Sequence, residues 1–156
     1  MTLAGKLLDA GKGKILLPFD HVVASAFKAD AETKTLPVNE TPEGWMGLDI
    51  GPETVAAFRH EIEKAALVLW NGPMGVFEMK PFSVGTFAVA KALADSKATT
   101  IVGGGDSVAA IAEAGLMDKI THVSTGGGAS LEFLGGDTLP GVECLDDDPN
   151  PSSVGG

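Results

Sequence analysis

The sequence predicts an α/β fold in which a parallel β-sheet alternates with helices. Short apolar runs, typical of buried strands, alternate along the chain with segments of helical periodicity. Strands joined through helical crossovers pair in parallel. Glycine-rich turns follow several of the predicted strands. The length of 156 residues, 44% of them hydrophobic, suits one compact domain.

The first third of the chain departs from this alternation. Residues 1–10 predict a short amphipathic helix, and residues 14–17 (KILL) predict the first strand of the parallel sheet. Residues 22–39 carry two apolar stretches around the polar ADAET, which predicts a small antiparallel hairpin. Residues 52–64 predict a helix, because Val55, Phe58 and Ile62 recur at helical spacing and Pro52 suits the first turn.

The regular alternation follows. Residues 65–70 (AALVLW), 99–102 (TTIV) and 120–123 (ITHV) predict three further strands, each stopped by glycine or a polar turn. Residues 84–93 and 107–114 predict the helices between them. We therefore expect four strands, including residues 14–17, in one parallel sheet. The end of the chain is acidic and then rich in proline, serine and glycine, which predicts a flexible tail over residues 146–156.

Composition excludes several classes of protein. With 11 basic and 21 acidic side chains the formal charge is -10, which disfavours nucleic acid or an anionic membrane as a partner. The single cysteine, Cys144, cannot build an internal disulfide framework, and the three histidines have no metal-ligand spacing. The sequence has neither a secretory signal nor a long apolar span. We expect a soluble, cytoplasmic protein.

Glycine concentrates in three turns, at residues 71–78, 103–107 and 125–130. Loops that follow parallel strands share one edge of the sheet, where ligands bind. Without side chains, backbone N–H groups at a helix N-terminus can approach an anion, so an acidic protein can hold phosphate there. Asp106 would repel a phosphate unless a cation such as Mg²⁺ lay between them. The alternative is that Asp106 or Ser107 only caps the following helix.

Other features of the sequence have more than one interpretation. Glu78 follows the first glycine turn and either accepts hydrogen bonds from a sugar or is simply solvated. Residues 105–109 (GDSVA) resemble the nucleophile elbow GxSxG of a serine hydrolase, with His122 further along the chain. Neither GxxxxGK[ST] nor a clean GxGxxG occurs, so the two common nucleotide-binding fingerprints are absent.

Five ordered motifs together resemble phosphoglycerate kinase. They are KILLPFDHVVA, GWMGLDIGPET, LVLWNGPMGVFE, IVGGGDS and HVSTGGGASLEFL, followed by LPGVECL, and they extend from about Lys14 to Leu145. The resemblance implies a Rossmann-like, three-layer fold. It also implies that residues 1–145 are the later part of the carboxyl-terminal nucleotide-binding domain of that family, and that this domain is incomplete here.

The resemblance implies binding of ADP or ATP with Mg²⁺, and reversible phosphoryl transfer between 1,3-bisphosphoglycerate and ADP in glycolysis. Its nucleotide contacts would be Gly47, Leu48 and Val76 for adenine, Glu78 for ribose, and Asn71, Pro73, Asp106 and Ser107 for the phosphates. Asp106 would also be the magnesium-linked carboxylate. Gly126, Gly127 and Gly128 would be catalytic, because they present a helix N-terminus to the transferred phosphoryl group.

Several family features are absent from this sequence. They are the amino-terminal domain with its basic patch for phosphoglycerate, a GGAKVSDK-like segment whose lysine supports the transferred group, and a further strand ending in a glycine triplet. In the family's strand order, the two missing strands belong near the centre of the sheet. We therefore expect 3-phosphoglycerate or 1,3-bisphosphoglycerate to bind only with the missing domain. The chain is then either part of an active kinase or a non-catalytic nucleotide-binding or structural fragment.

Overall fold

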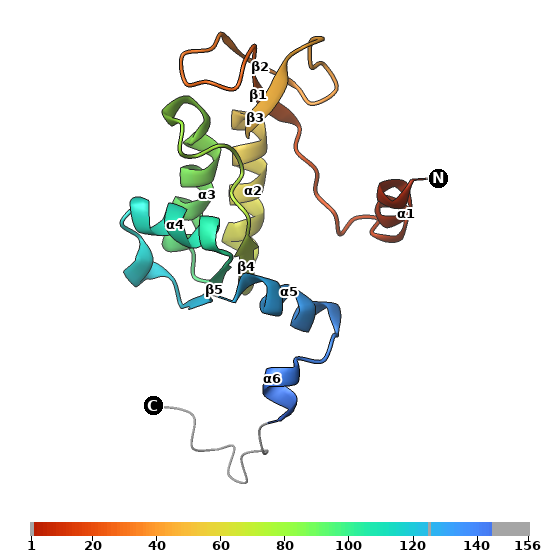
Figure 1. Ribbon diagram of the computed structural model, residues 1–156, viewed down its shortest axis with the longest axis vertical. Coiled ribbons are helices and arrows are strands. Elements are labelled where there is room, and N and C mark those ends of the chain that lie inside the picture. The colour runs from red at the N-terminus through yellow and green to blue at the C-terminus, as the bar shows by residue number, and fades with distance from the viewer. Residues whose placement is uncertain (1, 125, 145–156) are drawn as a thin grey trace.

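A computed structural model describes residues 2–124 and 126–144 (Figure 1). The predicted tail therefore lies outside the described residues. The elements follow in this order: α1 (Leu3–Ala10), β1 (Asp20–Ala24), β2 (Thr33–Pro37), β3 (Met46–Ile50), α2 (Pro52–Lys64), β4 (Leu67–Asn71), the 3-10 turn Lys80–Phe82, α3 (Val84–Asp95), β5 (Thr99–Gly103), α4 (Gly105–Glu113), the 3-10 turn Met117–Lys119, β6 (His122–Ser124), α5 (Gly127–Gly135) and α6 (Pro140–Glu143). The predicted three-layer α/β class is confirmed, and so are the predicted helices to within a few residues.

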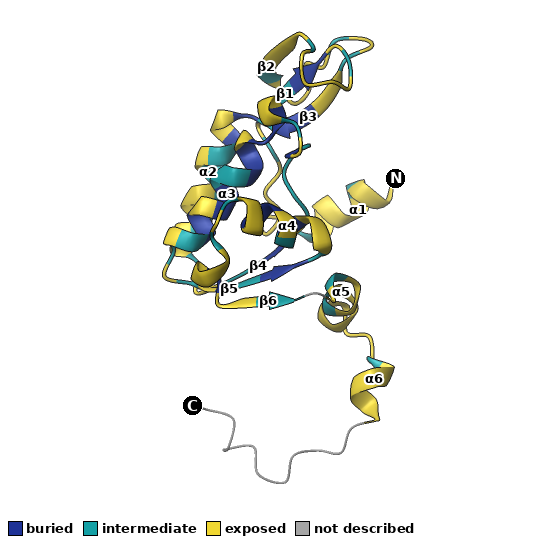
Figure 2. Ribbon diagram, turned by 60° about the vertical axis from the view of Figure 1, so that its left-hand side comes forward, coloured by how far each residue is buried: buried dark blue, intermediate teal, exposed yellow. Residues whose placement is uncertain are grey.

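The parallel sheet has the order β4-β5-β6. In its register Leu67 lies opposite Thr99 and Ile101 opposite His122, so each strand begins and ends near its neighbour. Figure 2 shows α2, α3 and α4 on one side of this sheet. Three of the four predicted strands thus form the expected sheet.

Residues 14–17 do not form the predicted fourth strand. Ile15, Leu16 and Leu17 are 44%, 43% and 52% exposed, and the segment has no regular secondary structure. Among the described residues, no backbone hydrogen bond joins it to a strand; the N–H groups of Lys14 and Ile15 both bond to the carbonyl of Gly11. The prediction was wrong because an apolar run becomes a strand only where a neighbour accepts and donates its backbone hydrogen bonds.

The predicted hairpin is confirmed, and it belongs to a larger antiparallel sheet of order β2-β1-β3. Val22 of the central strand lies opposite Thr35 of β2 and Asp49 of β3. A register shift between Val22 and Val23 interrupts the β1–β3 ladder. The sheet places the GWMGLDIG motif, which contains β3, beside the N-terminal ends of α2 and α3 (Figure 1).

The buried residues form two clusters. The larger lies between the parallel sheet and its helices and contains, among others, Trp70, Phe77, Leu93, Val102 and Ile111. The smaller joins the antiparallel sheet to the 3-10 turn after the first glycine turn, through Ala24, Leu48 and Phe82. The segment 71–82 therefore contributes to both clusters, with Phe77 in the larger and Phe82 in the smaller.

A buried carboxylate joins β1 to α2. Asp20 accepts hydrogen bonds from the N–H groups of Glu53 and Thr54, at 3.0 and 2.8 Å, and from the Thr54 hydroxyl at 2.7 Å. The residue before α2, Gly51, has no side chain to cap this helix, so Asp20 caps it from another element. Burial alone would raise the pKa of Asp20, but the hydrogen bonds from Thr54 and Glu53 outweigh burial and hold the pKa below its ordinary value of 3.8.

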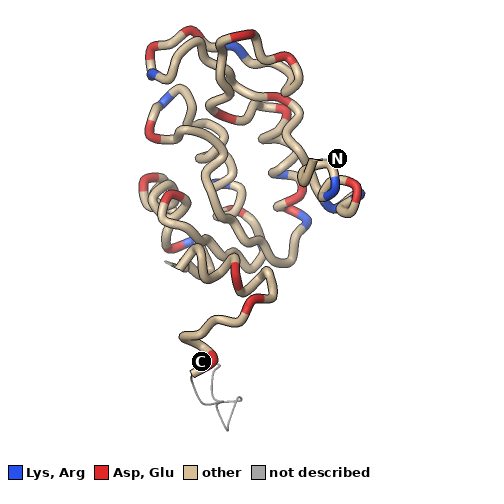
Figure 3. Tube along the Cα trace, turned by 45° about the vertical axis from the view of Figure 1, so that its right-hand side comes forward, with Lys and Arg blue, Asp and Glu red and all other residues tan. Residues whose placement is uncertain are grey.

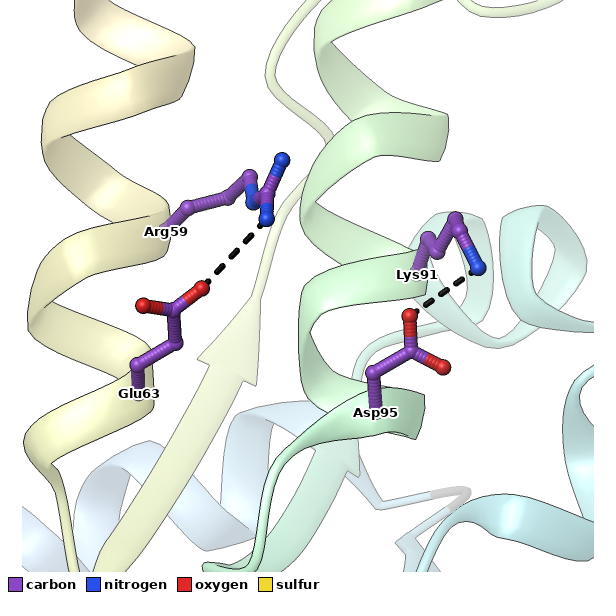
Figure 4. Close-up of polar contacts among 4 residues, drawn as sticks. All are labelled: Arg59, Glu63, Lys91 and Asp95. Atoms are coloured by element: carbon purple, nitrogen blue, oxygen red, sulfur yellow. Dashed lines mark hydrogen bonds and ion pairs between the residues drawn. The ribbon is translucent and has the colours of Figure 1, made fainter.

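The helix surfaces carry exposed ion pairs. Figure 4 shows Arg59 with Glu63 on α2, at 3.4 Å, and Lys91 with Asp95 on α3, at 2.9 Å. The hydrogen bond from Lys91 lowers the pKa of Asp95. Such solvated pairs contribute little to stability.

No helix in the described residues has the length and apolarity needed to cross a membrane.

Candidate functional site

The three glycine turns meet at one edge of the parallel sheet. Asn71, the last residue of β4, lies opposite Gly103 at the end of β5, and Gly103 lies opposite Ser124 at the end of β6. The turns that follow therefore leave the sheet side by side. Residue 125 lies outside the described residues, and the third turn is described from Gly126 onward. The predicted common edge is confirmed.

The backbones at this edge approach too closely for side chains. A Cβ atom on Gly127 would lie 2.7 Å from Cα and 2.8 Å from N of Gly104, and one on Gly104 would lie 3.2 Å from Oδ1 of Asn71. Gly104 also has a φ of 88°, which an L side chain rarely adopts. Glycine is thus required here by contact and by conformation, and Gly104 and Gly127 present only backbone at this edge.

Two helices begin at this edge with glycine at the N-cap. The N-cap of α4 is Gly104 and that of α5 is Gly126, and among residues 2–124 and 126–144 no side chain makes a cap hydrogen bond to either helix. The free N–H groups at a helix start, together with the helix dipole, attract an anion. The predicted residues Gly126 and Gly128 are exposed, and Gly127 is partly buried against Gly104.

Asp106 lies in the first turn of α4 and is exposed. Among the described residues it accepts no hydrogen bond, so the alternative that it only caps the helix is wrong. Within the same residues, no three His, Cys, Asp or Glu side chains gather into a group that could hold a metal by themselves. A single free carboxylate fits Mg²⁺ that arrives with a phosphate ligand, because Mg²⁺ takes one or two carboxylates together with phosphate oxygens and water.

Ser107 is fully buried, and its hydroxyl accepts a hydrogen bond from the N–H of Gly72 at 2.7 Å. This bond ties the second glycine turn to the first. A hydrolase nucleophile must instead be exposed on its turn and bonded to a base. His122 lies exposed on β6, and among the described residues no hydrogen bond joins it to Ser107. The serine hydrolase alternative is therefore wrong.

The first glycine turn extends from the sheet edge to β3. The N–H of Val76 donates to the carbonyl of Leu48 at 2.9 Å, so Val76 lies beside Gly47 and Leu48, as the adenine prediction requires. Leu48 is buried in the smaller core. Pro73 is partly buried, and Glu78 is exposed after the turn.

Two residues that position this turn were not predicted. The Thr86 hydroxyl accepts hydrogen bonds from the N–H groups of Met74 and Gly75, at 3.0 and 3.2 Å. Asp49 accepts a hydrogen bond from the N–H of Gly85 at 2.8 Å, where α3 begins. Burial raises the pKa of Asp49, although the hydrogen bonds that it accepts from backbone N–H groups oppose this rise. An aspartate inside the apolar stretch of β3 is the one sequence signal that could have indicated Asp49.

A cavity lies away from this edge. A groove of about 620 Å³ extends between residues 13–16, α2, β4 and α3, and none of the predicted site residues lines it. The predicted site is an open edge without basic side chains, and Figure 3 shows the few Lys and Arg residues scattered among more numerous acidic ones. This edge therefore offers an anion backbone N–H groups in place of basic side chains.

Comparison with known proteins decides the family. A family model described as phosphoglycerate kinase matches residues 1–137. The chain belongs to the phosphoglycerate kinase family. The phosphoglycerate kinase of Herpetosiphon aurantiacus is 57% identical over 147 residues, which are 92% of this chain and 37% of that protein. The cytosolic phosphoglycerate kinase of Triticum aestivum is 53% identical over 94% of this chain and 38% of its own length.

Solved phosphoglycerate kinase structures share the fold. The enzyme from Coxiella burnetii superposes with a TM-score of 0.79 at 38% identity, over 88% of this chain and 38% of that one. The enzyme from Pyrococcus horikoshii gives a TM-score of 0.78 over 90% of this chain and 34% of its own. The chain thus spans little more than a third of the length of these phosphoglycerate kinases.

Proposed function

We propose that this chain is the nucleotide-binding portion of a phosphoglycerate kinase, and that it binds Mg-ADP or Mg-ATP at the shared edge of the three glycine turns. The observation that carries the proposal is the convergence of two helix N-termini that start at glycine, beside an exposed carboxylate, Asp106, that has no hydrogen-bond partner in the described part of the chain. The reaction it would serve is reversible phosphoryl transfer between 1,3-bisphosphoglycerate and ADP. Residues 1–145 are then part of the carboxyl-terminal domain of that enzyme.

The phosphates would lie against backbone. The N-terminus of α5, at Gly126, Gly127 and Gly128, would face the transferred phosphoryl group and stabilise the charge that develops on it. Asn71 and Pro73 would flank the phosphates. Mg²⁺, carried by the nucleotide and held by Asp106, would neutralise phosphate charge.

Ser107 has a narrower role than a free hydroxyl would have. Its oxygen already accepts the Gly72 N–H, so it can reach a phosphate only by donating its own proton. We propose that it acts chiefly by fixing the first and second glycine turns relative to each other.

The nucleoside would extend along the first glycine turn toward β3. The backbone contact between Val76 and Leu48 places Gly47, Leu48 and Val76 together, which supports an adenine contact there. Glu78 is exposed and would accept hydrogen bonds from the ribose hydroxyls. A cytoplasmic location is the matching expectation, supported by the relative named cytosolic in Triticum aestivum.

Replacing Asp106 with asparagine is expected to abolish the magnesium dependence of nucleotide binding. Asparagine cannot supply the negative charge that Mg²⁺ prefers, yet it leaves the helix start sterically unchanged. The affinity for ADP is measured by calorimetry with Mg²⁺ and with a chelator, for the parent chain and for Asp106→Asn. We expect roughly tenfold tighter binding with Mg²⁺ for the parent only, as one lost charge-assisted contact predicts. Equal affinities in all four measurements would overturn the magnesium role.

The third glycine turn offers a matched pair of variants. A methyl group on Gly127 would collide with the Gly104 backbone, whereas one on Gly128 meets nothing within 4 Å. Gly127→Ala is therefore expected to displace the turns and weaken Mg-ADP binding roughly tenfold, consistent with about 1–3 kcal/mol for overpacking, while Gly128→Ala stays close to the parent. The same calorimetric titration measures both. An unchanged affinity for Gly127→Ala would show that this edge does not hold the phosphates.

A further inference from the structure

The backbone proposed to contact adenine lies on a strand with an irregular ladder. β3 is an outer strand of the order β2-β1-β3, and its pairing with β1 is interrupted. Val22 lies opposite Asp49 and Val23 lies opposite Gly47, so Leu48 has no partner in β1. An extra residue of this kind is a β-bulge, which redirects backbone groups away from the neighbouring strand. The carbonyl of Leu48 accordingly accepts a hydrogen bond from the first glycine turn, at 2.9 Å.

Asp49 fixes the next residue of β3 against the start of α3. Its side chain is 5% exposed, and both carboxylate oxygens accept hydrogen bonds. Oδ2 accepts the N–H of Gly85 at 2.8 Å, and Oδ1 accepts the N–H of Ile50 at 2.9 Å. Because Gly85 lies in the first turn of α3, Asp49 caps that helix from a strand. The carboxylate thus holds β3 and α3 in one relative position.

Thr86, the next residue of α3, holds the first glycine turn. It is fully buried, and its hydroxyl accepts the N–H groups of Met74 and Gly75 at 3.0 and 3.2 Å. The packing here leaves no room for adjustment, since a Cβ atom on Gly75 would lie 2.6 Å from the carbonyl oxygen of Leu48 and 2.7 Å from Cα of Asp49. β3, the start of α3 and the first glycine turn are therefore joined in one network.

This network is separate from the turns proposed to hold the phosphates. Among the described residues, neither Asp49 nor Thr86 makes a side-chain hydrogen bond to the second or third glycine turn. The second turn is joined to the first by a different bond, from the N–H of Gly72 to the Ser107 hydroxyl. The two ends of the proposed nucleotide site consequently depend on different supporting side chains.

We propose that Asp49 is a positioning residue for the nucleoside: together with Thr86 it holds the backbone of Gly47 and Leu48 beside the first glycine turn, and it does not contribute to binding of the phosphates. The identity of the ligand rests on the function proposed above, whereas the hydrogen-bond network does not. Loss of either side chain then lowers the affinity for a nucleotide and spares the affinity for its phosphates alone.

Separate affinities for the nucleotide and for its phosphates test this proposal. The parent, Asp49→Asn and Thr86→Val are titrated by calorimetry with Mg-ADP and with Mg-pyrophosphate, which carries phosphates without a nucleoside. Asparagine has the shape of aspartate but replaces one accepting oxygen with a donor, and valine lacks the Thr86 hydroxyl. We expect both variants to bind Mg-ADP roughly tenfold more weakly than the parent, and Mg-pyrophosphate within about twofold of it. Thr86→Val decides the test should Asp49→Asn fail to fold.

Two further variants separate positioning from stability. Thr86→Ser retains the accepting hydroxyl and is expected to recover most of the affinity lost in Thr86→Val. Thr100→Val removes another buried hydroxyl, on β5, which accepts the N–H of Thr121 at 3.1 Å. It is expected to lower stability without lowering the affinity for Mg-ADP. Urea unfolding measures the stability of each variant, and circular dichroism verifies that each is folded.

The position of β3 can also be followed without a ligand. Thr86 makes no side-chain hydrogen bond to β3 in the described residues, so Thr86→Val can act on Gly47 only through neighbouring elements. In chains labelled with ¹⁵N-glycine, we expect the amide resonance of Gly47 to move in Thr86→Val and to stay in place in Thr100→Val. A moved resonance would support a common support for β3 and the first glycine turn.

The outcomes separate this inference from the proposed function. Unchanged Mg-ADP affinity in Asp49→Asn and Thr86→Val overturns the inference, and so does an equal loss of affinity for Mg-ADP and Mg-pyrophosphate. An equal loss of Mg-ADP affinity in Thr100→Val also overturns it, because affinity would then follow stability alone. A parent chain that binds neither ligand overturns the proposed function. The Gly47 resonance then tests the positioning by itself, and an unmoved resonance in Thr86→Val overturns it.

Discussion

The purified chain is expected to transfer no measurable phosphoryl group between 1,3-bisphosphoglycerate and ADP. Transfer requires both substrates in line, and positioning of this kind lowers a barrier by about 7–11 kcal/mol. The proposed site holds only the nucleotide, and the charge of -10 repels an anionic substrate that no basic patch gathers. We therefore expect a rate lower than that of a complete enzyme by on the order of 10⁵-fold or more.

A coupled assay of ATP formation tests this expectation. The chain is assayed alone and after joint refolding with the unmatched portion of the Herpetosiphon aurantiacus enzyme, and Asp106→Asn in the same mixture is the control for the nucleotide site. Robust turnover by the chain alone would contradict the prediction. Activity in the mixture only would support an enzyme completed by a second polypeptide. A mixture that forms a complex and binds Mg-ADP without turnover would favour the non-catalytic nucleotide-binding alternative.

Loss of the Asp20 carboxylate is expected to destabilise the fold by about 2–4 kcal/mol, which is the range for breaking a buried network of charge-assisted hydrogen bonds. Asp20→Ala leaves the N–H groups of Glu53 and Thr54 and the Thr54 hydroxyl without their acceptor. Thr54→Val removes the hydroxyl that donates to Asp20, and Thr54→Ser is the matched control that retains this hydroxyl. Urea unfolding followed by circular dichroism measures all three, and parent-like midpoints for Asp20→Ala and Thr54→Val would contradict the role of this network.

The same carboxylate predicts a pH dependence. The pKa of Asp20 is below 3.8 in the folded chain, so its ionised form stabilises folding fully at pH values well above 3.8. As the pH falls below 3.8, through the folded pKa, this contribution is lost. The difference in unfolding free energy between the parent and Asp20→Asn should therefore narrow in acid. Asp49, whose pKa is raised, acts in the opposite direction in both proteins and cancels in the comparison. A difference that is constant or grows in acid would contradict the assignment.

Local patterns predicted most of the parallel part of the fold. Periodicity located α2, α3 and α4, and the apolar runs located β4, β5 and β6 to within a few residues. The meeting of Asn71, Gly104 and Gly127 also followed from sequence, because parallel strands joined by helices have their carboxyl ends at one edge. Each of these predictions used only residues that lie near one another in the chain, together with the general rule that parallel strands are joined by right-handed crossover connections.

Contacts between distant residues were harder to predict. Asp49 and Thr86 position the first glycine turn through hydrogen bonds to Gly85 and to Met74 and Gly75, and no spacing rule joins β3 to the start of α3. Ser107 looks like an accessible hydroxyl in sequence, yet it is buried against Gly72. The resemblance to phosphoglycerate kinase named residues for ligand contact and did not indicate these supporting bonds.

The sequence by itself determined which segments are helical, where glycine must replace a side chain, and which family the chain resembles, because periodicity, turn chemistry and motif order are properties of neighbouring residues. Only the tertiary structure decided that Asp20 caps α2 from a strand and that Ser107 is buried. It also decided that, within residues 2–124 and 126–144, residues 14–17 pair with no strand and Asp106 has no hydrogen-bond partner. Pairing and burial depend on what another part of the chain places opposite a residue. The residues next to a side chain in the sequence do not specify that distant partner.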